Sequence, residues 1–213
     1  MSARILLVDD HVAVRQGLRQ ILAEEFPDAT FGMADGAAQA MTSLRESEWD
    51  VAILDLNLPG RGGLDLIREL KDEQPGLSIL VYTMHGETQL GVRAIRSGAD
   101  GYLTKDAPPS EIPTAVRRLL AGSRYIPPDL AAKLADAVAS GAQQPHELLS
   151  DREYQILERL ASGQTPTQIG HELSLSVKTI STYRTRILQK LQLTNTSELI
   201  RYAIENGIGK PAT

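Results

Sequence analysis

The stretch "AILDLNLPGRGG", residues 52–63, places a single carboxylate, Asp55, directly after an apolar run. A short apolar run bounded by turn residues is typical of a buried strand in a parallel sheet. Pro59 and Gly60 fit a type II turn after this strand, in which glycine supplies the positive φ. Asp55 is therefore an acid that follows a buried strand, and its position requires an explanation.

Short β-rich runs alternate with helical segments through the first half of the chain. Including the run before Asp55, the predicted strands cover residues 4–8, 30–34, 51–55, 78–83 and 101–104. The segments between them carry apolar residues at helical spacing, as Ile112, Ala115, Val116 and Leu119 do. Five strands alternating with five helices predict an α/β fold with a doubly wound, five-stranded parallel sheet.

Polar side chains follow four of these strands. Asp9 and Asp10 come after the first, Asp55 ends the third, Thr83 ends the fourth and Lys105 follows the fifth. The carboxyl ends of parallel strands meet at one edge of the sheet, where ligands bind in open α/β folds. Each of these residues taken alone is better explained as a helix cap or a solvated loop residue. All of them at corresponding positions favour a functional site.

The charges at this edge indicate what the site holds. Carboxylates 4 Å apart repel by about 4 kcal/mol per pair at an effective dielectric near 20. Lys105 offsets one of three negative charges, and a divalent cation would offset the other two. Oxygen ligands favour Mg²⁺, with Mn²⁺ as a substitute. A carboxylate beside such a metal, a lysine and a hydroxyl can attack a phosphoryl group.

Other classes of protein are less consistent with the chain. It lacks the GxGxxG and GxxxxGK[ST] loops of dinucleotide-binding enzymes and P-loop NTPases. It has 213 residues, no cysteine and a net charge of −5. We expect a cytoplasmic protein of two small domains that has no signal peptide and does not bind membranes. Up to Gly122 there are 12 Lys and Arg residues and 18 acids, a net charge of −6, whereas beyond it there are 10 and 9, a net charge of +1. The two halves therefore differ in net charge.

The second half is predicted to be helical. Residues 123–146 resemble a linker that carries one helix near 129–139. Further helices are predicted near 151–162, 166–173, 177–191 and 196–206. Three capping boxes mark helix starts, at Ser150 with Glu153, Thr165 with Gln168 and Asn195 with Glu198. The short connection before Val177 predicts a helix-turn-helix.

The helix over 177–191 is the chain's most basic segment, with four Lys or Arg residues and no acid. One face presents short polar side chains together with Lys178 and Gln189. Such a face suits the DNA major groove. An amphipathic helix with a solvated face is the alternative that this segment alone allows.

The segments "ILLVDDH", "VAILDLNLPGRGGLDLI", "LVYTMH" and "SGADGYLTKDA" resemble the receiver domain of bacterial two-component response regulators, over roughly residues 3–122. The resemblance implies that Asp55 accepts phosphate from a sensor histidine kinase. It implies that Asp9, Asp10 and Asp55 hold magnesium together with the backbone carbonyl of Asn57. Thr83 and Lys105 match the phosphoryl-binding residues, and Tyr102 matches an aromatic switch that turns inward when the threonine moves. The chain departs from many receivers in having Asp106, rather than proline, after the lysine.

Residues 148 to about 208 resemble the LuxR-type helix-turn-helix, which identifies the whole as similar to the NarL/FixJ family. Pro166 and Gly170 depart from the family's commoner residues, and Glu153 matches a common glutamate. The implied DNA-binding set is Lys178, Thr179, Ser181, Thr182, Thr185, Arg186 and Lys190. Within it, Ser181, Thr182 and Thr185 match base-reading positions, and Lys178, Arg186 and Lys190 match phosphate contacts.

Together these observations predict a transcription factor whose DNA binding is controlled by magnesium-dependent phosphorylation of Asp55. The expected domains are a receiver at 1–122, a linker at 123–146 and a DNA-binding domain at 147–213. The expected partners are the kinase, promoter DNA with an inverted repeat, a second phosphorylated copy and, as a further candidate, RNA polymerase. The chain would be no enzyme beyond its own phosphoryl transfer and dephosphorylation. The alternatives are a phosphoaspartate phosphohydrolase and a DNA-binding regulator that ignores phosphorylation.

Overall fold

The computed structural model describes residues 2–58, 62–84, 88–139, 145–173 and 175–209. The turn expected at Pro59 and Gly60 lies outside these residues. The chain divides into two compact units, Met1–Gly141 and Ala142–Thr213. Among the described helices, none has both the length and the apolar character needed to cross a membrane.

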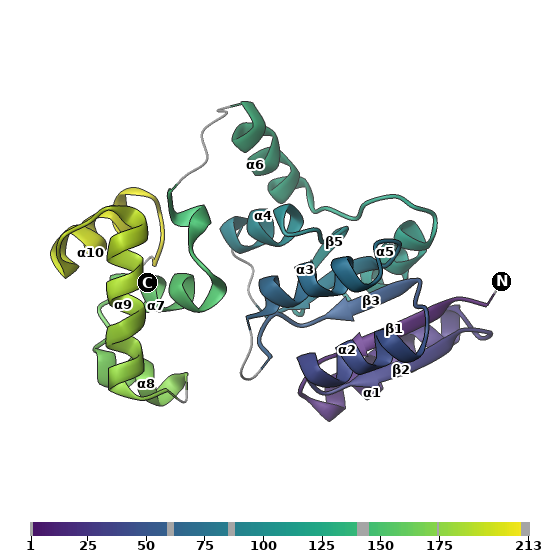
Figure 1. The fold of residues 1–213 in the computed structure, drawn as a ribbon. Coiled ribbons are helices and arrows are strands. Elements are labelled where there is room, and N and C mark those ends of the chain that lie inside the picture. Colours follow the sequence, from purple (N-terminus) through teal and green to yellow (C-terminus); the bar gives the residue numbers. More distant parts are fainter. Residues whose placement is uncertain (1, 59–61, 85–87, 140–144, 174, 210–213) are drawn as a thin grey trace. The chain divides into compact units, whose positions relative to one another are not determined.

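The first unit is built on a parallel sheet with strand order β2-β1-β3-β4-β5 (Figure 1). Its strands are β1 (Arg4–Val8), β2 (Thr30–Ala34), β3 (Val51–Leu54), β4 (Ser78–Thr83) and β5 (Gly101–Thr104). The predicted doubly wound parallel sheet is confirmed. Val8 pairs with Leu54 and Thr83 with Thr104, so the strands that carry the polar residues end close together.

Helices cover both faces of this sheet. The core on one face includes residues of α1 (Val12–Glu25) and α5 (Glu111–Leu120). The core on the other face includes residues of α2 (Ala37–Glu46), α3 (Gly63–Glu73) and α4 (Thr88–Arg96). In β1, Ile5 and Leu7 enter the first core, and Leu6 and Val8 enter the second. The apolar run is continuous because neither face of the strand meets water.

The helix expected in the linker is α6 (Pro128–Ala139), and it packs against α4 of the first unit. Leu130 of α6 is 4% exposed and belongs to the core that contains α4. A Cβ atom added at Gly91 would lie 2.8 Å from Leu130 Cδ2. The absence of a side chain at Gly91 therefore lets Leu130 approach the backbone of α4.

The second unit is helical. It comprises the short 3₁₀ helix η1 (Pro145–Leu148), α7 (Asp151–Ala161), α8 (Pro166–Glu172), α9 (Val177–Leu191) and α10 (Thr196–Glu205). The core includes Ile156, Ile169, Ile187 and Leu199, one from each α-helix, and all four are fully buried. The apolar stripe of α9 faces this core, which leaves its polar face outward.

Two of the three predicted capping boxes are present, at Ser150 with Glu153 and at Thr165 with Gln168. The third is wrong. Asn195 caps α10 by accepting the backbone N–H of Glu198 at 3.0 Å. The Glu198 carboxylate instead accepts the backbone N–H of Thr194 at 2.7 Å and its hydroxyl at 2.8 Å. Two donors on the residue before the cap draw the carboxylate away from the cap itself.

Candidate functional site

Backbone hydrogen bonds at the strand ends fix the acidic residues side by side. The N–H of Asp55 donates to the carbonyl of Val8 at 2.9 Å, and the N–H of Lys105 donates to that of Thr83 at 2.8 Å. Asp9 follows β1 directly, and its N–H donates to the carbonyl of Ala34 at 3.1 Å. The sheet pairing thus continues one residue past β1, β3 and β5 and holds Asp9, Asp55 and Lys105 at one edge.

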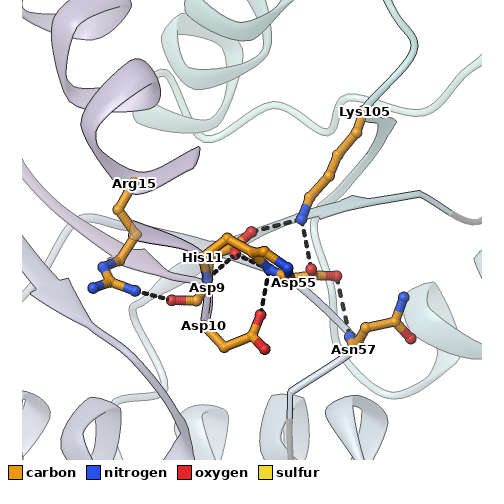
Figure 2. Close-up of polar contacts among 7 residues, drawn as sticks. All are labelled: Asp9, Asp10, His11, Arg15, Asp55, Asn57 and Lys105. Atoms are coloured by element: carbon orange, nitrogen blue, oxygen red, sulfur yellow. Dashed lines mark hydrogen bonds and ion pairs between the residues drawn. The ribbon is translucent and has the colours of Figure 1, made fainter. Parts of the chain in front are cut away.

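Lys105 joins the two buried carboxylates (Figure 2). Its Nζ lies 2.6 Å from Asp9 Oδ2 and 2.6 Å from Asp55 Oδ2. The three side chains are between 2% and 9% exposed. Burial alone would lower the pKa of Lys105, but its hydrogen bonds to Asp55 and Asp9, together with their charges, raise the pKa above its usual value. Lys105 is therefore a fixed cation within the site.

The remaining oxygens of the two acids accept backbone hydrogen bonds. Asp55 Oδ1 accepts the N–H of Asn57 at 3.1 Å, and Asp9 Oδ1 accepts the N–H of His11 at 2.8 Å. Arg15 on α1 donates to the backbone carbonyl of Asp9 (Figure 2). Each carboxylate is thus held from two directions, which fixes its orientation at the sheet edge.

Asp10 is the acid whose charge is least compensated. Its Oδ1 is buried and pairs with Nδ1 of the exposed His11 ring at 2.6 Å (Figure 2), and no backbone N–H of the described residues donates to it. Ligand atoms of Asp9, Asp10 and His11 lie within 4.8 Å of one another. The set of buried carboxylate oxygens at this edge suits a hard cation. The sequence indicated the three aspartates, whereas the approach of the exposed His11 ring to Asp10 depends on a side-chain orientation.

Two other predicted residues of this edge, Thr83 and Tyr102, are buried. Thr83 is fully buried, and Tyr102 is 3% exposed within the core shared by α3 and α4. The aromatic ring that the resemblance expects to turn inward is thus already inside the unit. Asn57 is exposed, with its backbone N–H bound to Asp55. Hydrogen bonds join Asp9, Asp55, Lys105 and the backbone of Asn57, while Thr83 adjoins the site through its carbonyl, which accepts the N–H of Lys105.

In the second unit, one face of α9 is exposed and polar. Lys178, Thr182, Thr185 and Gln189 follow one another at helical spacing, and all are exposed. Arg186 is also exposed, and its guanidinium lies 5.9 Å from the centroid of the Tyr183 ring. This face has the polarity and positive charge of a surface that enters the major groove.

Two residues of the predicted DNA-binding set have roles inside the unit. The backbone N–H of Thr179 donates to the Ser176 hydroxyl at 3.0 Å, which caps α9. Lys190 Nζ lies 2.7 Å from Glu153 Oε2 and donates to the carbonyl of Leu148 at 3.2 Å. In this structure Lys190 is therefore engaged within the protein rather than open to a phosphate.

Comparisons with known proteins match both units. Residues 5–117 match the model of the response regulator receiver domain, and residues 147–203 match that of bacterial regulatory proteins of the luxR family. The response regulator GacA of Pseudomonas aeruginosa is 37% identical over 207 residues, which cover 96% of this chain and 97% of GacA. The response regulator UvrY of Escherichia coli strain K12 is 35% identical over 206 residues, which cover 96% of this chain and 94% of UvrY.

Solved structures show the same architecture. RcsB from Salmonella enterica serovar Typhimurium, bound to a promoter in the presence of the phosphomimetic BeF₃⁻, aligns with a TM-score of 0.60 and 27% identity. The alignment covers 95% of this chain and 98% of that one. A LuxR-family response regulator from Aurantimonas sp. SI85-9A1 is 38% identical with a TM-score of 0.59, over 65% of this chain and 99% of that one.

Proposed function

Because the chain belongs to the NarL/FixJ family of two-component response regulators, we propose that phosphorylation of Asp55 controls how its luxR-type domain binds DNA. The chain is a transcription regulator with a receiver domain and a DNA-binding domain. The observation that carries the proposal is the contact of Lys105 with both Asp9 and Asp55. It supports Asp55 as a carboxylate oriented beside a fixed cation.

Phosphorylation would begin with the attack of an Asp55 carboxylate oxygen on the phosphorus of a phosphohistidine in a sensor kinase. The new O–P bond forms as the N–P bond breaks, and the imidazole leaves with the electron pair of that bond. Lys105 would shift its hydrogen bond from the carboxylate to a phosphoryl oxygen, where negative charge collects. The buried Thr83 hydroxyl ends the neighbouring strand and would bind a second phosphoryl oxygen.

The donor set supports a magnesium site at the same edge. Asp9, Asp10 and Asp55 would bind the ion with their carboxylates, and Asn57 would bind it with its backbone carbonyl. The buried Asp10 Oδ1 has no backbone donor among the described residues and lies 2.6 Å from Nδ1 of the exposed His11 ring, which fits a cation ligand. When bound, Mg²⁺ would neutralise the phosphoryl oxygens, and Mn²⁺ would substitute for it.

Phosphorylation would act on DNA binding through Thr83 and Tyr102. We propose a receiver at 1–122, a linker at 123–146 whose helix packs on the receiver, and a DNA-binding domain at 147–213. Movement of Thr83 toward the phosphoryl group would favour the inward position of Tyr102. A bias of a few kcal/mol between two existing states is enough for control.

We further propose a cytoplasmic protein whose phosphorylated form binds an inverted repeat in promoter DNA as a homodimer. A solved assembly contains two RcsB dimers bound to two parallel DNAs, which supports a dimer on DNA. Lys178 and Arg186 would contact phosphates, and Ser181, Thr182 and Thr185 would face the bases. RNA polymerase is a further candidate partner at the promoter, and the only reactions catalysed would be the chain's own phosphorylation and dephosphorylation.

The test is phosphorylation by acetyl phosphate with magnesium, followed by intact-protein mass spectrometry. Wild type should gain one phosphoryl group, and Asp55→Ala should gain none. Asp35→Ala is the matched control because Asp35 is an exposed acid that follows β2, which β1 separates from the strand that Asp55 follows. Labelling of Asp55→Ala would contradict the site. Equal DNA affinity of wild type and Asp55→Ala under these conditions would instead favour a regulator that ignores phosphorylation.

A further inference from the structure

The two threonines on the exposed face of α9 do not have free hydroxyl hydrogens. The Thr182 hydroxyl donates to the backbone carbonyl of Lys178 at 3.0 Å. The Thr185 hydroxyl donates to the carbonyl of Ser181 at 3.1 Å. Both bonds follow the i to i−4 pattern by which threonine binds its own helix. Each hydroxyl is therefore already used as a donor in this structure.

This arrangement changes what the two side chains offer to a base. A threonine has two substituents on Cβ, and the hydroxyl of each is turned to the helix backbone, so the methyl remains as the outer group. Thr182 and Thr185 are both exposed, three residues apart on the same face. The face between Lys178 and Gln189 thus carries two methyl groups rather than two hydrogen-bond donors.

Base edges in the major groove differ in whether they need a hydrogen-bond donor or an apolar contact from the protein. Guanine offers N7 and O6 as acceptors, which need a donor from the protein. Thymine offers a C5-methyl group, which is matched by apolar contact. A threonine whose hydrogen is committed to its helix satisfies no acceptor of guanine, but its methyl can pack against the methyl of thymine.

We propose that Thr182 and Thr185 read thymine through their methyl groups, so that the half-site of this protein carries thymine at the two base positions they face. The inference rests on the proposed DNA-binding function of α9 and adds the base that this function selects. Lys178 and Arg186 would contribute phosphate contacts, which position the helix without selecting a base.

The experiment uses the full chain with acetyl phosphate and magnesium, and duplexes enriched from a randomised pool by the wild-type protein. Deoxyuridine then replaces each thymine of the enriched half-site, which removes only the C5-methyl group. Burial of one methyl or methylene group contributes roughly 0.8 kcal/mol, so each contacted methyl should raise the affinity about fourfold. Binding is measured by fluorescence anisotropy at one fixed salt concentration because phosphate contacts make affinity depend on salt.

Paired substitutions separate the methyl from the hydroxyl. Thr182→Val and Thr185→Val keep the methyl and remove the hydroxyl, so each should retain the roughly fourfold preference for thymine over deoxyuridine at its position. Thr182→Ser and Thr185→Ser keep the hydroxyl and remove the methyl, so each should bind about fourfold more weakly and should lose sensitivity to deoxyuridine at one position. Far-UV circular dichroism checks that all four variants retain the helical fold.

The outcomes distinguish the recognition of thymine from the proposed binding of DNA by α9. Weak binding by the valine variants with full binding by the serine variants would overturn the inference, as would an enriched site whose affinity ignores deoxyuridine. In both cases DNA binding itself would stand. Failure of the wild-type chain to enrich or bind any duplex would overturn the proposed function, and the inference with it.

Discussion

The ammonium group of Lys190 and the carboxylate of Glu153 form an ion pair that joins α9 to the first turn of α7, with 2.7 Å between Nζ and Oε2. The Glu153 side chain is 4% exposed and also accepts the backbone N–H of Ser150 at 2.8 Å. Burial alone would raise the pKa of Glu153, but its hydrogen bonds to Lys190 and Ser150, with the lysine charge, lower the pKa. Helix α9 is thus positioned partly by a buried acid.

Lys190→Met should lower the free energy of unfolding of the second unit by about 1–2 kcal/mol because it leaves the buried Glu153 without its cation. The chain has one tryptophan, Trp49, which lies in the first unit. The loss should therefore appear in denaturation followed by far-UV circular dichroism and not in tryptophan fluorescence. Lys178→Met, at an exposed position of the same helix, is the control and should change neither transition.

The lowered pKa of Glu153 predicts a dependence of stability on pH. A carboxyl whose pKa is lower in the folded state stabilises the fold above its unfolded pKa, about 4.3 for glutamate. That contribution is lost as the pH falls through the folded pKa. The stability difference between wild type and Glu153→Gln should be constant near pH 7 and should shrink below about pH 4. A difference that is the same at pH 3 and pH 7 would contradict this account.

Lys105→Met should destabilise the first unit because Asp9 and Asp55 would then face each other without a cation. Unfolding followed by Trp49 fluorescence should shift by about 2 kcal/mol, and magnesium should restore part of the loss. Lys71→Met is the control, since Lys71 pairs with Asp100 at 2.6 Å outside the site and magnesium should not rescue it.

The raised pKa of Lys105 also predicts a dependence of stability on pH. The contribution of Lys105 to the stability of the first unit is present below about pH 10.4 and is lost as the pH rises through the pKa of the folded state.

Asp10→Asn should weaken magnesium binding at least about tenfold, because it removes the charge of a proposed metal ligand whose described partner is the exposed His11 ring. Isothermal titration of the full chain with magnesium chloride measures the affinity. Asp35→Asn removes the same charge from an exposed position and should change the affinity little. Equal weakening by both variants would indicate a general charge effect rather than a site at Asp10.

Gly170→Ala should destabilise the second unit although alanine favours helices by about 1 kcal/mol over glycine. A Cβ atom at Gly170 would lie 2.7 Å from the backbone oxygen of Leu175. The turn before α9 is closed by the N–H of Leu175, which donates to the Gly170 carbonyl at 2.8 Å. Crowding of this turn should cost about 1–3 kcal/mol and reduce DNA affinity. Increased stability by circular dichroism would show that the turn can move aside.

The sheet could be predicted from the sequence because its strands are apolar on both faces. Four strands have the predicted limits, and β3 ends at Leu54, one residue early, where Asp55 turns into the site. The meeting of Asp9, Asp55 and Lys105 was also predictable, since parallel strands bring their carboxyl ends to one edge. What the sequence could not give is the side-chain geometry, such as the place of His11 beside Asp10.

Contacts between distant segments could not be predicted from the sequence, for a physical reason. The pair of Lys190 and Glu153 depends on how α7 and α9 cross, which no local pattern contains. Val177 fits the apolar stripe of α9 by spacing but is 47% exposed, because it is the first residue of the helix and lies at the rim of the core. The composition of residues 123–146 indicated a linker, whereas the fit of Leu130 to Gly91 attaches its helix to the first unit.

Because of that contact, α6 would move together with α4. Its 12 residues give a rod of about 18 Å whose near end is seated on α4 through Leu130. A rotation of α4 that leaves this seat intact must carry α6 with it, and a turn of about 10° would move the far end of the rod by about 3 Å. A small rotation of α4 would therefore become a larger displacement at the end of α6, where the chain leaves the first unit.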